Sequence, residues 1–152
     1  MRSLEINAPM DLRLVEKEVT SPGAGQVRIA VEYGGICGSD LGYWKKGISG
    51  TAVMKRPFVL GHEISGRIEE LGEGVTGFEV GSAQLVYGPV GCGHCPACSR
   101  GQDTYCEHPT DVGYAALGRD GGMAEYMTAP RATWSPSATP TPSPPRRSRT
   151  PA

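Results

Sequence analysis

The stretch CGHCPACSRGQDTYC, residues 92–106, contains four of the five cysteines of this 152-residue chain. In its spacing, C-x2-C-x2-C-x7-C, two overlapping turns supply three thiolates and a longer arm supplies the fourth. Four thiolates are the ligand set of a tetrahedral structural zinc site, which has no open coordination position. Soft sulfur ligands also favour zinc over metals that prefer oxygen. The stretch therefore predicts a lobe, residues 91–107, folded around one zinc ion that is held by Cys92, Cys95, Cys98 and Cys106.

Two alternatives compete with zinc at these cysteines. An iron–sulfur cluster is one, because C-x2-C-x2-C also begins bacterial ferredoxin motifs, although those continue x3-C-P rather than x7-C. Disulfides are the other, and a reducing compartment disfavours them. His94 lies inside the lobe, but with four thiols present we expect it to be a solvent-facing turn residue. A closed ligand set leaves no room for substrate, so the lobe is expected to maintain a shape and to catalyse nothing.

Length and composition indicate a single β-rich domain. A chain of this size can bury roughly 70% of the surface that its unfolded form exposes, which is enough for one core. The chain has 22 glycines, and its short apolar segments are interrupted by Gly, Pro and Asp. This pattern favours strands and turns over long helices.

The charge distribution and the amino terminus limit the classes of function. The net charge is −1, but residues 131–152 hold four Arg and no acid, so residues 1–130 carry 11 Lys and Arg against 16 Asp and Glu, a net charge of −5. A mildly acidic body has no electrostatic footprint for nucleic acid. The start of the chain lacks the apolar core of a signal peptide, and no run approaches the ~20 apolar residues of a membrane span. We expect a cytoplasmic protein that binds neither nucleic acid nor membranes.

The first half of the chain predicts two strands and a short helix. Segments 11–19 and 26–33 alternate apolar and polar residues, as strands with one buried face do, and TSPGAG between them is a turn. In the second strand Val27, Ile29 and Val31 should point inward. A helix capped by Ser39 or Asp40 should then run to Lys46 and end at Gly47.

The remaining segments predict further strands. PFVLGHEISGRIEELG, residues 57–72, indicates a strand that enters and leaves a Gly-His-Glu turn, with Ile64, Gly66 and Ile68 on one face. Segments 78–89 and 121–130 predict two more strands, the last with Met123 and Tyr126 packed.

The fifth cysteine, Cys37, lies in GICGSD, and 25 residues later stand His62 and Glu63. A single Cys is usually a small buried hydrophobe, and a single His is usually a satisfied core or surface residue. Together, each on a glycine-flanked turn after a β-like segment, they could form an open zinc site. The spacing by itself only suggests this.

Four motifs in order carry a family resemblance: GICGSD (35–40), LGHEISGRIEELGEGVTGFEVG (60–81), GCGHCPACSRGQDTYC (91–106) and GGMAEYM (121–127). From about residue 10 to residue 130 the chain resembles the amino-terminal catalytic domain of zinc-dependent medium-chain alcohol dehydrogenases. The resemblance implies a GroES-like, partly open β-barrel with short helices and a zinc-binding lobe. It also implies a small alcohol or carbonyl substrate and transfer of hydride to NAD(P). Full-length members of the family are oligomers.

The resemblance assigns roles to residues outside the lobe. Cys37 and His62 match ligands of the catalytic zinc, and Glu63 matches an occasional or alternate ligand beside it. Ser39 matches the hydroxyl that accepts the substrate proton, and Asp40 matches the carboxylate that orients the ligating histidine. Tyr43 and Trp44 are candidate walls of the substrate pocket, and equally candidates for packed helix residues. The relay histidine of the family has no match, because position 42 is Gly.

Several parts of the family pattern are missing. GEGVTG, Gly72 to Gly77, matches G-x-G-x-x-G, but a strand-like segment follows it and no βαβ unit surrounds it, so we interpret these glycines as turns. No other segment predicts a Rossmann domain. In the family, that domain and the third protein ligand of the catalytic zinc lie beyond the matched region.

Residues 131–152 differ in composition from the rest, with six Pro, four Ser, four Thr and four Arg. Such a segment cannot bury enough apolar surface to offset its ordering entropy, which predicts disorder. We hypothesise that the native reading frame is lost near residues 129–131, because such a composition is typical of out-of-frame translation of GC-rich genes. A flexible end and a Pro-rich ligand for a partner domain are alternative interpretations.

The sequence thus predicts a zinc-binding catalytic domain over residues 1–130, truncated before a nucleotide-binding domain, and a tail over 131–152. The alternative is an inactive zinc-binding fragment. A zinc-ribbon module for nucleic acid fails on charge, and a zinc-free quinone reductase relative is disfavoured by the complete cysteine set and the Gly-His-Glu motif.

Overall fold

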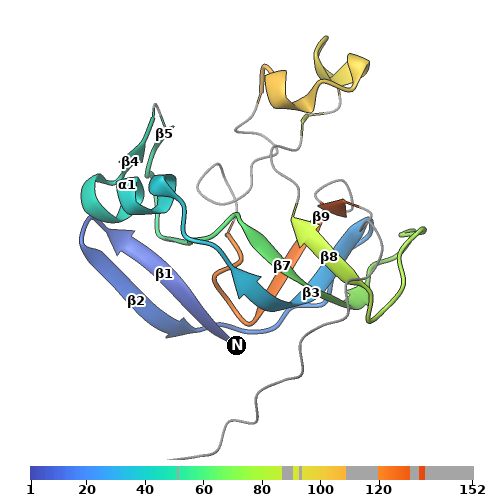
Figure 1. Cartoon of the computed structure of the whole chain (residues 1–152), viewed down its shortest axis with the longest axis horizontal. Coiled ribbons are helices and arrows are strands. Elements are labelled where there is room, and N and C mark those ends of the chain that lie inside the picture. The colour runs from blue at the N-terminus through green and yellow to red at the C-terminus, as the bar shows by residue number, and fades with distance from the viewer. Residues whose placement is uncertain (51, 87–90, 93, 109–119, 131–133, 136–152) are drawn as a thin grey trace, which may run out of the picture.

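A computed structural model of the chain describes residues 1–50, 52–86, 91–92, 94–108, 120–130 and 134–135. Strands dominate these residues, and there is one α-helix (Figure 1). The strands are β1 (Arg2–Ala8), β2 (Asp11–Glu16), β3 (Gln26–Gly34), β4 (Ile48–Ser49), β5 (Ala52–Val53), β6 (Phe58–Val59), β7 (Ile64–Leu71), β8 (Ala83–Val86), β9 (Tyr126–Pro130) and β10 (Trp134–Ser135). The helices are α1 (Gly38–Lys46) and two short 3-10 turns, η1 (Cys98–Arg100) and η2 (Asp103–Tyr105).

The larger sheet has the strand order β10-β8-β7-β3-β9, and every neighbouring pair in it is antiparallel. Strand β3 is its centre, paired with β7 on one side and β9 on the other. The main core lies on one face of these three strands, and alternate side chains build it because successive residues of a strand point to opposite faces. Its fully buried members are Val27, Ile29, Ile64, Ile68, Met127 and Ala129, with Val31 packed against them.

A second sheet, β2-β1-β6, carries α1 on one face. Its core is formed by Ile6, Tyr43, Phe58 and Leu60, with Trp44 and Met123 packed against the group. The rings of Tyr43 and Phe58 meet edge to face, with centroids 5.4 Å apart and planes at 86°. This is a favoured aromatic geometry, so Tyr43 belongs to the core and its interpretation as a packed helix residue is right.

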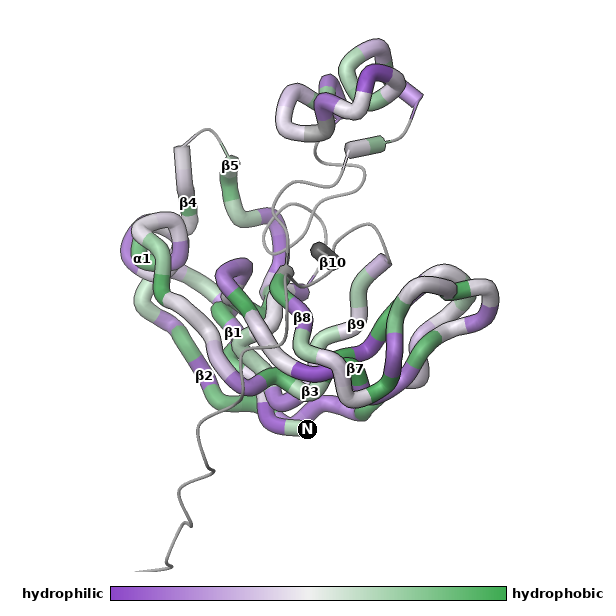
Figure 2. The backbone as a smooth tube through the Cα atoms, turned by 45° about the vertical axis from the view of Figure 1, so that its right-hand side comes forward, coloured by the Kyte–Doolittle hydropathy of each residue, from purple (hydrophilic) through white to green (hydrophobic). Residues whose placement is uncertain are grey.

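The predicted fold class, mainly β with short helices and a separate cysteine lobe, is confirmed, and the described strands do not close into a complete barrel (Figure 1). Figure 2 shows hydrophobic and hydrophilic residues alternating along β1, β2 and β3, the pattern of strands with two different faces. The two sheets are linked by an isolated bridge between Ser3 and Ala124.

The predicted strand and helix between residues 26 and 72 are confirmed in detail. Val27 and Ile29 are fully buried, and Ile64, Gly66 and Ile68 share the buried face of β7. Helix α1 ends at Gly47, whose φ of 68° is the left-handed conformation that glycine adopts without steric strain. The cap prediction was wrong, because Cys37 is the N-cap and Asp40 lies in the first turn with its carboxylate reaching back to the Cys37 N–H.

The first twenty residues differ from the prediction. Strand β1 was not predicted, and β2 pairs with β1 rather than with β3. The expected buried face of segment 11–19 was also wrong, since Leu12 and Leu14 are 37% and 68% exposed. The alternation did mark a strand, but α1 covers the β1 half of this face, around Ile6, and leaves the β2 half open.

The carboxy-terminal strands are shorter than predicted or lie outside the expected region. Within the described residues 78–86, Ala83–Val86 form a strand and residues 78–82 include a turn but no strand, while residues 87–89 lie outside the described residues. Strand β9 is confirmed, with Tyr126 beneath the guanidinium of Arg28 at 5.7 Å. Trp134 and Ser135 pair with β8, and the expected disorder of residues 131–152 stays a prediction. Residues 131–133 and 136–152 lie outside the described residues.

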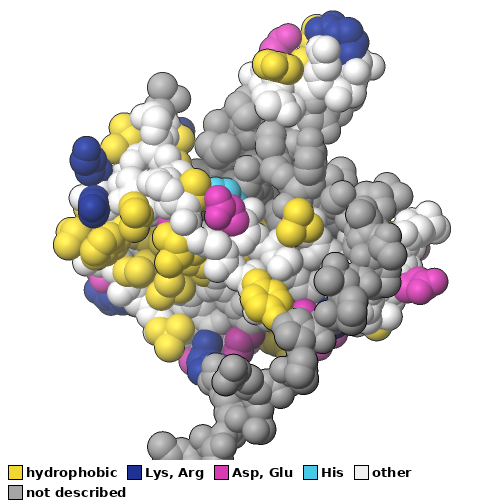
Figure 3. Space-filling view, in the orientation of Figure 1, with side chains coloured by type: hydrophobic (Ala, Val, Ile, Leu, Met, Phe, Trp, Pro, Cys, Tyr) yellow, Lys and Arg dark blue, Asp and Glu magenta, His cyan; other side chains and the backbone are white. Residues whose placement is uncertain are grey.

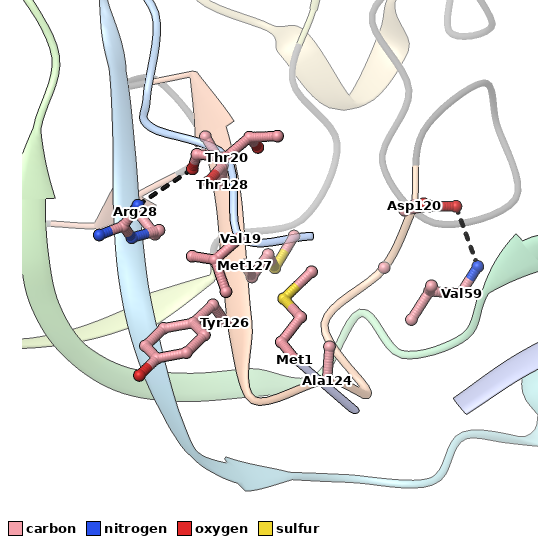
Figure 4. Close-up of a pocket in the computed structure, with 11 residues that line it drawn as sticks. Met1, Val19, Thr20, Arg28, Val59, Asp120, Ala124, Tyr126, Met127 and Thr128 are labelled. Atoms are coloured by element: carbon pink, nitrogen blue, oxygen red, sulfur yellow. Dashed lines mark hydrogen bonds between the residues drawn. The ribbon is translucent and has the colours of Figure 1, made fainter. Parts of the chain in front are cut away.

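An ion-pair network joins the two sheets near the amino terminus. The Lys17 ammonium lies 2.8 Å from Glu5 and 2.9 Å from Asp120, and Asp120 accepts a hydrogen bond from the Val59 N–H at 3.0 Å. Asp120 and Val59 line one end of a cavity of about 160 Å³, and Arg28 and Thr128 line the other (Figure 4). The cavity lies between the sheets, where the barrel is open.

We predict that Gly66→Ala destabilises the chain. A Cβ at position 66 would meet the backbone carbonyl of Ala30 on β3, and a backbone atom in the middle of a ladder cannot move away. Overpacking of this kind lowers the free energy of unfolding by about 2 kcal/mol. Denaturant unfolding of the zinc-loaded, reduced chain measures it.

Gly38→Ala is the matched control for that substitution. A Cβ at Gly38 would meet nothing within 4 Å, and helix propensity favours Ala over Gly by up to about 1 kcal/mol. Equal stability of the two variants would contradict the argument from the β3–β7 ladder.

Candidate metal centres

The pairing of β3 with β7 brings Cys37 close to His62. The two strands are antiparallel, with Gly34 opposite Ile64, so β3 leaves the sheet at the point where β7 enters it. The Gly35 N–H donates to the Glu63 carbonyl at 2.7 Å and extends the ladder past the last strand residue. The segments that carry the two side chains therefore start from the same end of the same strand pair.

Helix α1 begins at Cys37 and fixes that residue. The backbone N–H of Cys37 donates to Oδ2 of Asp40 at 2.8 Å. This hydrogen bond between backbone and side chain closes the first turn of the helix. A carboxylate in the first turn of a helix is also favoured by the positive end of the helix dipole. The thiol of Cys37 consequently stands at a rigid helix start, and it is half-buried.

The other carboxylate oxygen of Asp40 faces His62. Oδ1 lies 3.7 Å from Nδ1 of His62, and the Asp40 side chain is only 6% exposed. One buried carboxylate thus contacts both the segment that holds Cys37 and the ring of His62. The distance is that of a charge contact and is longer than a hydrogen bond, so the role of Asp40 in orienting the histidine stays a prediction.

Three ligand atoms converge at this place. The Sγ of Cys37, a ring nitrogen of His62 and a carboxylate oxygen of Glu63 all lie within 4.8 Å of one another. Thiolate, imidazole and carboxylate are the ligands that Zn²⁺ takes at catalytic sites, where three protein ligands leave a fourth position open. Glu63 is exposed and the other two are half-buried, so the cluster faces solvent on one side. The residues present fit a zinc ion.

A residue that the sequence reasoning missed is Gly35. A Cβ at this position would collide with Oε2 of Glu63, so only glycine leaves space for the carboxylate beside Cys37. The sequence contained a signal in the glycine pair at 34–35, placed where a predicted strand ends. The role of Gly35 could not be predicted, because the sequence does not show that the Glu63 side chain lies beside it.

The other predicted site residues lie on α1. Ser39 is two residues after Cys37, in the first turn, and is half-buried. A Cβ at Gly42 would lie 2.7 Å from the backbone oxygen of Ile48. The helix therefore packs closely against β4 at this position and leaves no space for a side chain larger than that of glycine. Trp44 is packed against the second core.

The four lobe cysteines also converge. Their sulfur atoms lie within 4.8 Å of one another, and Sγ of Cys92 is 4.0 Å from Sγ of Cys98. Short turns place them: η1 begins at Cys98 and ends at Gly101, and η2 precedes Cys106. All five cysteines of the chain are free thiols, so the disulfide alternative has no support in the geometry. Figure 1 shows the lobe projecting away from the two sheets.

Backbone amides surround the sulfur atoms of the lobe. Cys95 N–H donates to Sγ of Cys92 at 3.3 Å, Cys98 N–H to Sγ of Cys95 at 3.5 Å, and the N–H groups of Cys92 and His108 to Sγ of Cys106 at 3.3 Å. Donors aimed at sulfur stabilise the thiolate form, which is the form that binds metal. The four-thiol set therefore fits a closed zinc site.

These amides act most strongly on Cys95. The backbone N–H of Cys98, and next that of Glu107, lower the pKa of the Cys95 thiol from its usual value to about 6. Cys95 is also the buried member of the set. A buried thiol that ionises near neutral pH is prepared to bind a cation.

His94 has a different position from the four sulfur atoms. Its Nδ1 lies 3.0 Å from the Cys92 carbonyl, and its ring stacks on that of His108 with centroids 5.6 Å apart. The residue is exposed, as predicted for a solvent-facing turn.

The GEGVTG segment, Gly72 to Gly77, forms turns between β7 and β8 and opens no helix. The interpretation of these glycines as turns is therefore confirmed, and the segment lacks the helix N-terminus that pyrophosphate binding by this motif requires. Among the described residues, no helix is long and apolar enough to cross a membrane.

Comparison with known proteins finds consistent relatives. Residues 23–139 match the family described as alcohol dehydrogenase GroES-like domain. The starvation-sensing protein RspB of Escherichia coli K12 is 39% identical over 130 residues, which cover 86% of this chain and 37% of that protein. The sorbitol dehydrogenase of Halalkalibacterium halodurans is 41% identical over 117 residues, or 75% of this chain and 32% of the enzyme.

A solved structure agrees with these matches. An alcohol dehydrogenase from Escherichia coli CFT073, crystallised with the cofactor NADH, superimposes with a TM-score of 0.76 at 36% identity. The match covers 89% of this chain and 37% of that one. The chain therefore spans little more than a third of the length of these relatives.

We predict that the metal-free lobe contains a thiol that ionises near pH 6. Because the pKa of Cys95 is lowered in the folded chain, its contribution to stability is present above the unfolded value, ~8.5, and is lost as pH falls through about 6. A pH titration of thiolate absorbance should show this step in the wild type and not in Cys95→Ser. The same titration in guanidinium chloride is the control, and identical midpoints in native and denatured protein would refute the prediction.

Proposed function

Because this chain belongs to the alcohol dehydrogenase GroES-like domain family, we propose that it is the zinc-binding catalytic domain of an alcohol dehydrogenase-type oxidoreductase. The observation that carries the proposal is the convergence of Cys37, His62 and Glu63 within 4.8 Å at one end of the β3–β7 ladder. The cluster combines sulfur, nitrogen and oxygen ligands and is open on one side. The four-thiol lobe is closed and has a structural role in this proposal.

A zinc ion at the open cluster would supply Lewis-acid stabilisation of a developing alkoxide. The residues of this chain would hold the ion and orient the groups around it. Cys37 and His62 hold the ion, and Glu63 is a further or alternate ligand. Asp40, buried and 3.7 Å from Nδ1 of His62, keeps the imidazole oriented so that its other nitrogen faces the site. Ser39, in the first turn of α1, would accept the substrate proton and pass it outward in this proposal.

The substrate class follows from the open cluster and the relatives. The matched relatives include proteins named sorbitol dehydrogenase and L-threonine 3-dehydrogenase. Sorbitol and L-threonine, the compounds in these names, each contain a secondary alcohol. We infer a small alcohol, or the carbonyl compound formed from it, as the substrate of this site. The solved relative with NADH supports a nicotinamide as hydride acceptor in the complete enzyme. No described residue of this chain forms a dinucleotide site.

The extent of the catalytic domain, residues 1–130, and the loss of reading frame beyond it stay predictions. The family match continues to residue 139 and β10 lies past residue 130, so the boundary is tested by the genomic sequence around codons 129–131. A single uninterrupted family-like frame there would refute the frameshift.

Metal analysis separates the two centres. We expect two zinc ions per wild-type chain, and one in either Cys95→Ser or Cys37→Ser, by mass spectrometry of the purified, reduced protein. Cys95→Ser should also lower the melting temperature by several degrees, because a structural zinc contributes to folding directly. His62→Ala should leave the melting temperature nearly unchanged. Similar losses of stability in Cys95→Ser and His62→Ala would contradict this division of roles.

Cobalt substitution tests the open site without requiring the rest of an enzyme. In the Co²⁺-loaded chain, addition of a small secondary alcohol should change the visible absorption of the wild type, because an open coordination position can exchange its ligand. The change should persist in Cys95→Ser and disappear in Cys37→Ser. A response that requires Cys95, or no response in any variant, would refute the assignment of the open site.

A further inference from the structure

Strand β2 is the outer edge of the sheet β2-β1-β6, and no described strand pairs with its other side. An edge strand presents unpaired N–H and C=O groups to any further strand that approaches. The hydrogen bonds at its end show which residues these are. Met1 and Lys17 exchange two backbone bonds, Met1 N to Lys17 O at 2.6 Å and Lys17 N to Met1 O at 2.8 Å.

The alternation of an antiparallel ladder then orients the rest of β2. Counting back from the bonded pair Met1–Lys17 along the continuous register, Val15 and Arg13 direct their backbone groups toward β1. Leu12, Leu14 and Glu16 direct theirs outward, to the open edge. These outward groups are the ones that an approaching strand would meet.

The side chains at this edge form an apolar row. Leu12 and Leu14 lie opposite Ile6 and Leu4 of β1 and therefore share their face of the sheet. They are 37% and 68% exposed, and Met10 at the adjoining turn is 65% exposed. Figure 3 shows hydrophobic side chains gathered over α1 and the adjacent parts of β1 and β2. Leu12 and Leu14 thus lie on the uncovered part of a sheet face, and the part of the same face around Ile6 belongs to the core.

The opposite face of β2 carries a charge pattern that is complementary to itself. Asp11 and Arg13 form a two-pronged ion pair, with the Arg13 Nε 2.7 Å and Nη2 2.8 Å from the Asp11 carboxylate oxygens. A two-fold rotation that places Leu12 opposite Leu12 of a second copy also places Asp11 opposite Arg13, twice. In the same register Leu14 lies beside the turn that carries Met10 of the other copy, so the exposed apolar residues meet apolar residues.

Other registers are less favourable. Rotation about Arg13 would place the two Arg13 side chains directly opposite each other, and like charges in that position are destabilising. Rotation about Leu14 would place Leu12 opposite Glu16 and so set a carboxylate against the apolar row. Only the register centred on Leu12 satisfies both faces of the strand.

We propose that β2 pairs antiparallel with β2 of a second copy of this chain, centred on Leu12. Two three-stranded sheets become one continuous sheet across a two-fold axis, as in other isologous interfaces. The two Leu12 residues exchange N–H···O=C bonds, and the ladder is short, because Met10 lies before the strand in the left-handed conformation with its N–H bonded to the Trp44 carbonyl. This pairing is independent of the metal centres and of the proposed function.

A complementary pair of charge variants tests the register. Asp11→Arg alone and Arg13→Asp alone each set like charges opposite one another in a homodimer, and each should weaken dimerisation by roughly tenfold or more. An equimolar mixture of the two variants restores opposite charges at both positions and should dimerise as the wild type does. Sedimentation of the full, zinc-loaded and reduced chain over a range of concentrations measures all three.

Controls separate this pairing from a general effect of charge. Glu73→Arg and Lys55→Asp, at exposed positions away from β2, make the same changes in net charge and should leave dimerisation unchanged. A wild-type chain that stays monomeric, single variants that dimerise normally, or a mixture no better than its components would overturn the proposal. If a charge variant loses the native circular dichroism spectrum, Leu14→Lys replaces it, and undiminished dimerisation of Leu14→Lys would likewise overturn the proposal.

Discussion

The antiparallel ladder between β3 and β7 is the constraint on which the rest of the structure depends. It buries Val27, Ile29, Ile64 and Ile68 in one core, and its last pair, Gly34 opposite Ile64, sets where the chain leaves the sheet on both strands. Glycine at position 66 allows the two backbones to approach closely, because a Cβ there would collide with the Ala30 carbonyl, and glycine at position 35 leaves space for the Glu63 side chain. The open metal centre is a consequence of this register. A shift by one residue would turn the core residues outward and separate Cys37 from His62.

The two metal centres are built by different means. The lobe is local: four sulfur atoms from fifteen residues converge through short turns, and nearby backbone amides stabilise their ionised form. The open centre is assembled from a helix start and a strand start that are 25 residues apart, and buried Asp40 connects them. Local construction suits a closed site whose purpose is to hold a loop. Long-range construction on rigid elements suits a site in which a substrate must meet ligand atoms in fixed positions.

Where the sequence misled, tertiary packing decided. The alternation in segment 11–19 predicted a strand correctly, but its apolar face is buried only where another element covers it, and α1 packs around Ile6 of β1 while Leu12 and Leu14 of β2 stay exposed. The helix cap was assigned to Ser39 or Asp40 by residue preference, while the observed cap is Cys37, stabilised from the first turn by the Asp40 carboxylate. Segment 78–89 predicted one long strand, while among its described residues the strand begins only at Ala83.

The sequence by itself determined the residue types and the short-range geometry: the cysteine lobe, the helix ending at Gly47, the alternation of β3 and β7, and the candidate ligands Cys37, His62 and Glu63. The lobe, the helix end and the alternation follow from spacing and periodicity, which act over a few residues, whereas the three candidate ligands were assigned by the family resemblance. Only the tertiary structure decided which strands are neighbours, that Tyr43 is core, that Gly35 leaves space for Glu63, and that Leu12 and Leu14 remain exposed. The physical reason is that burial and contact are properties of pairs of segments, and a single strand or helix does not specify what will cover it.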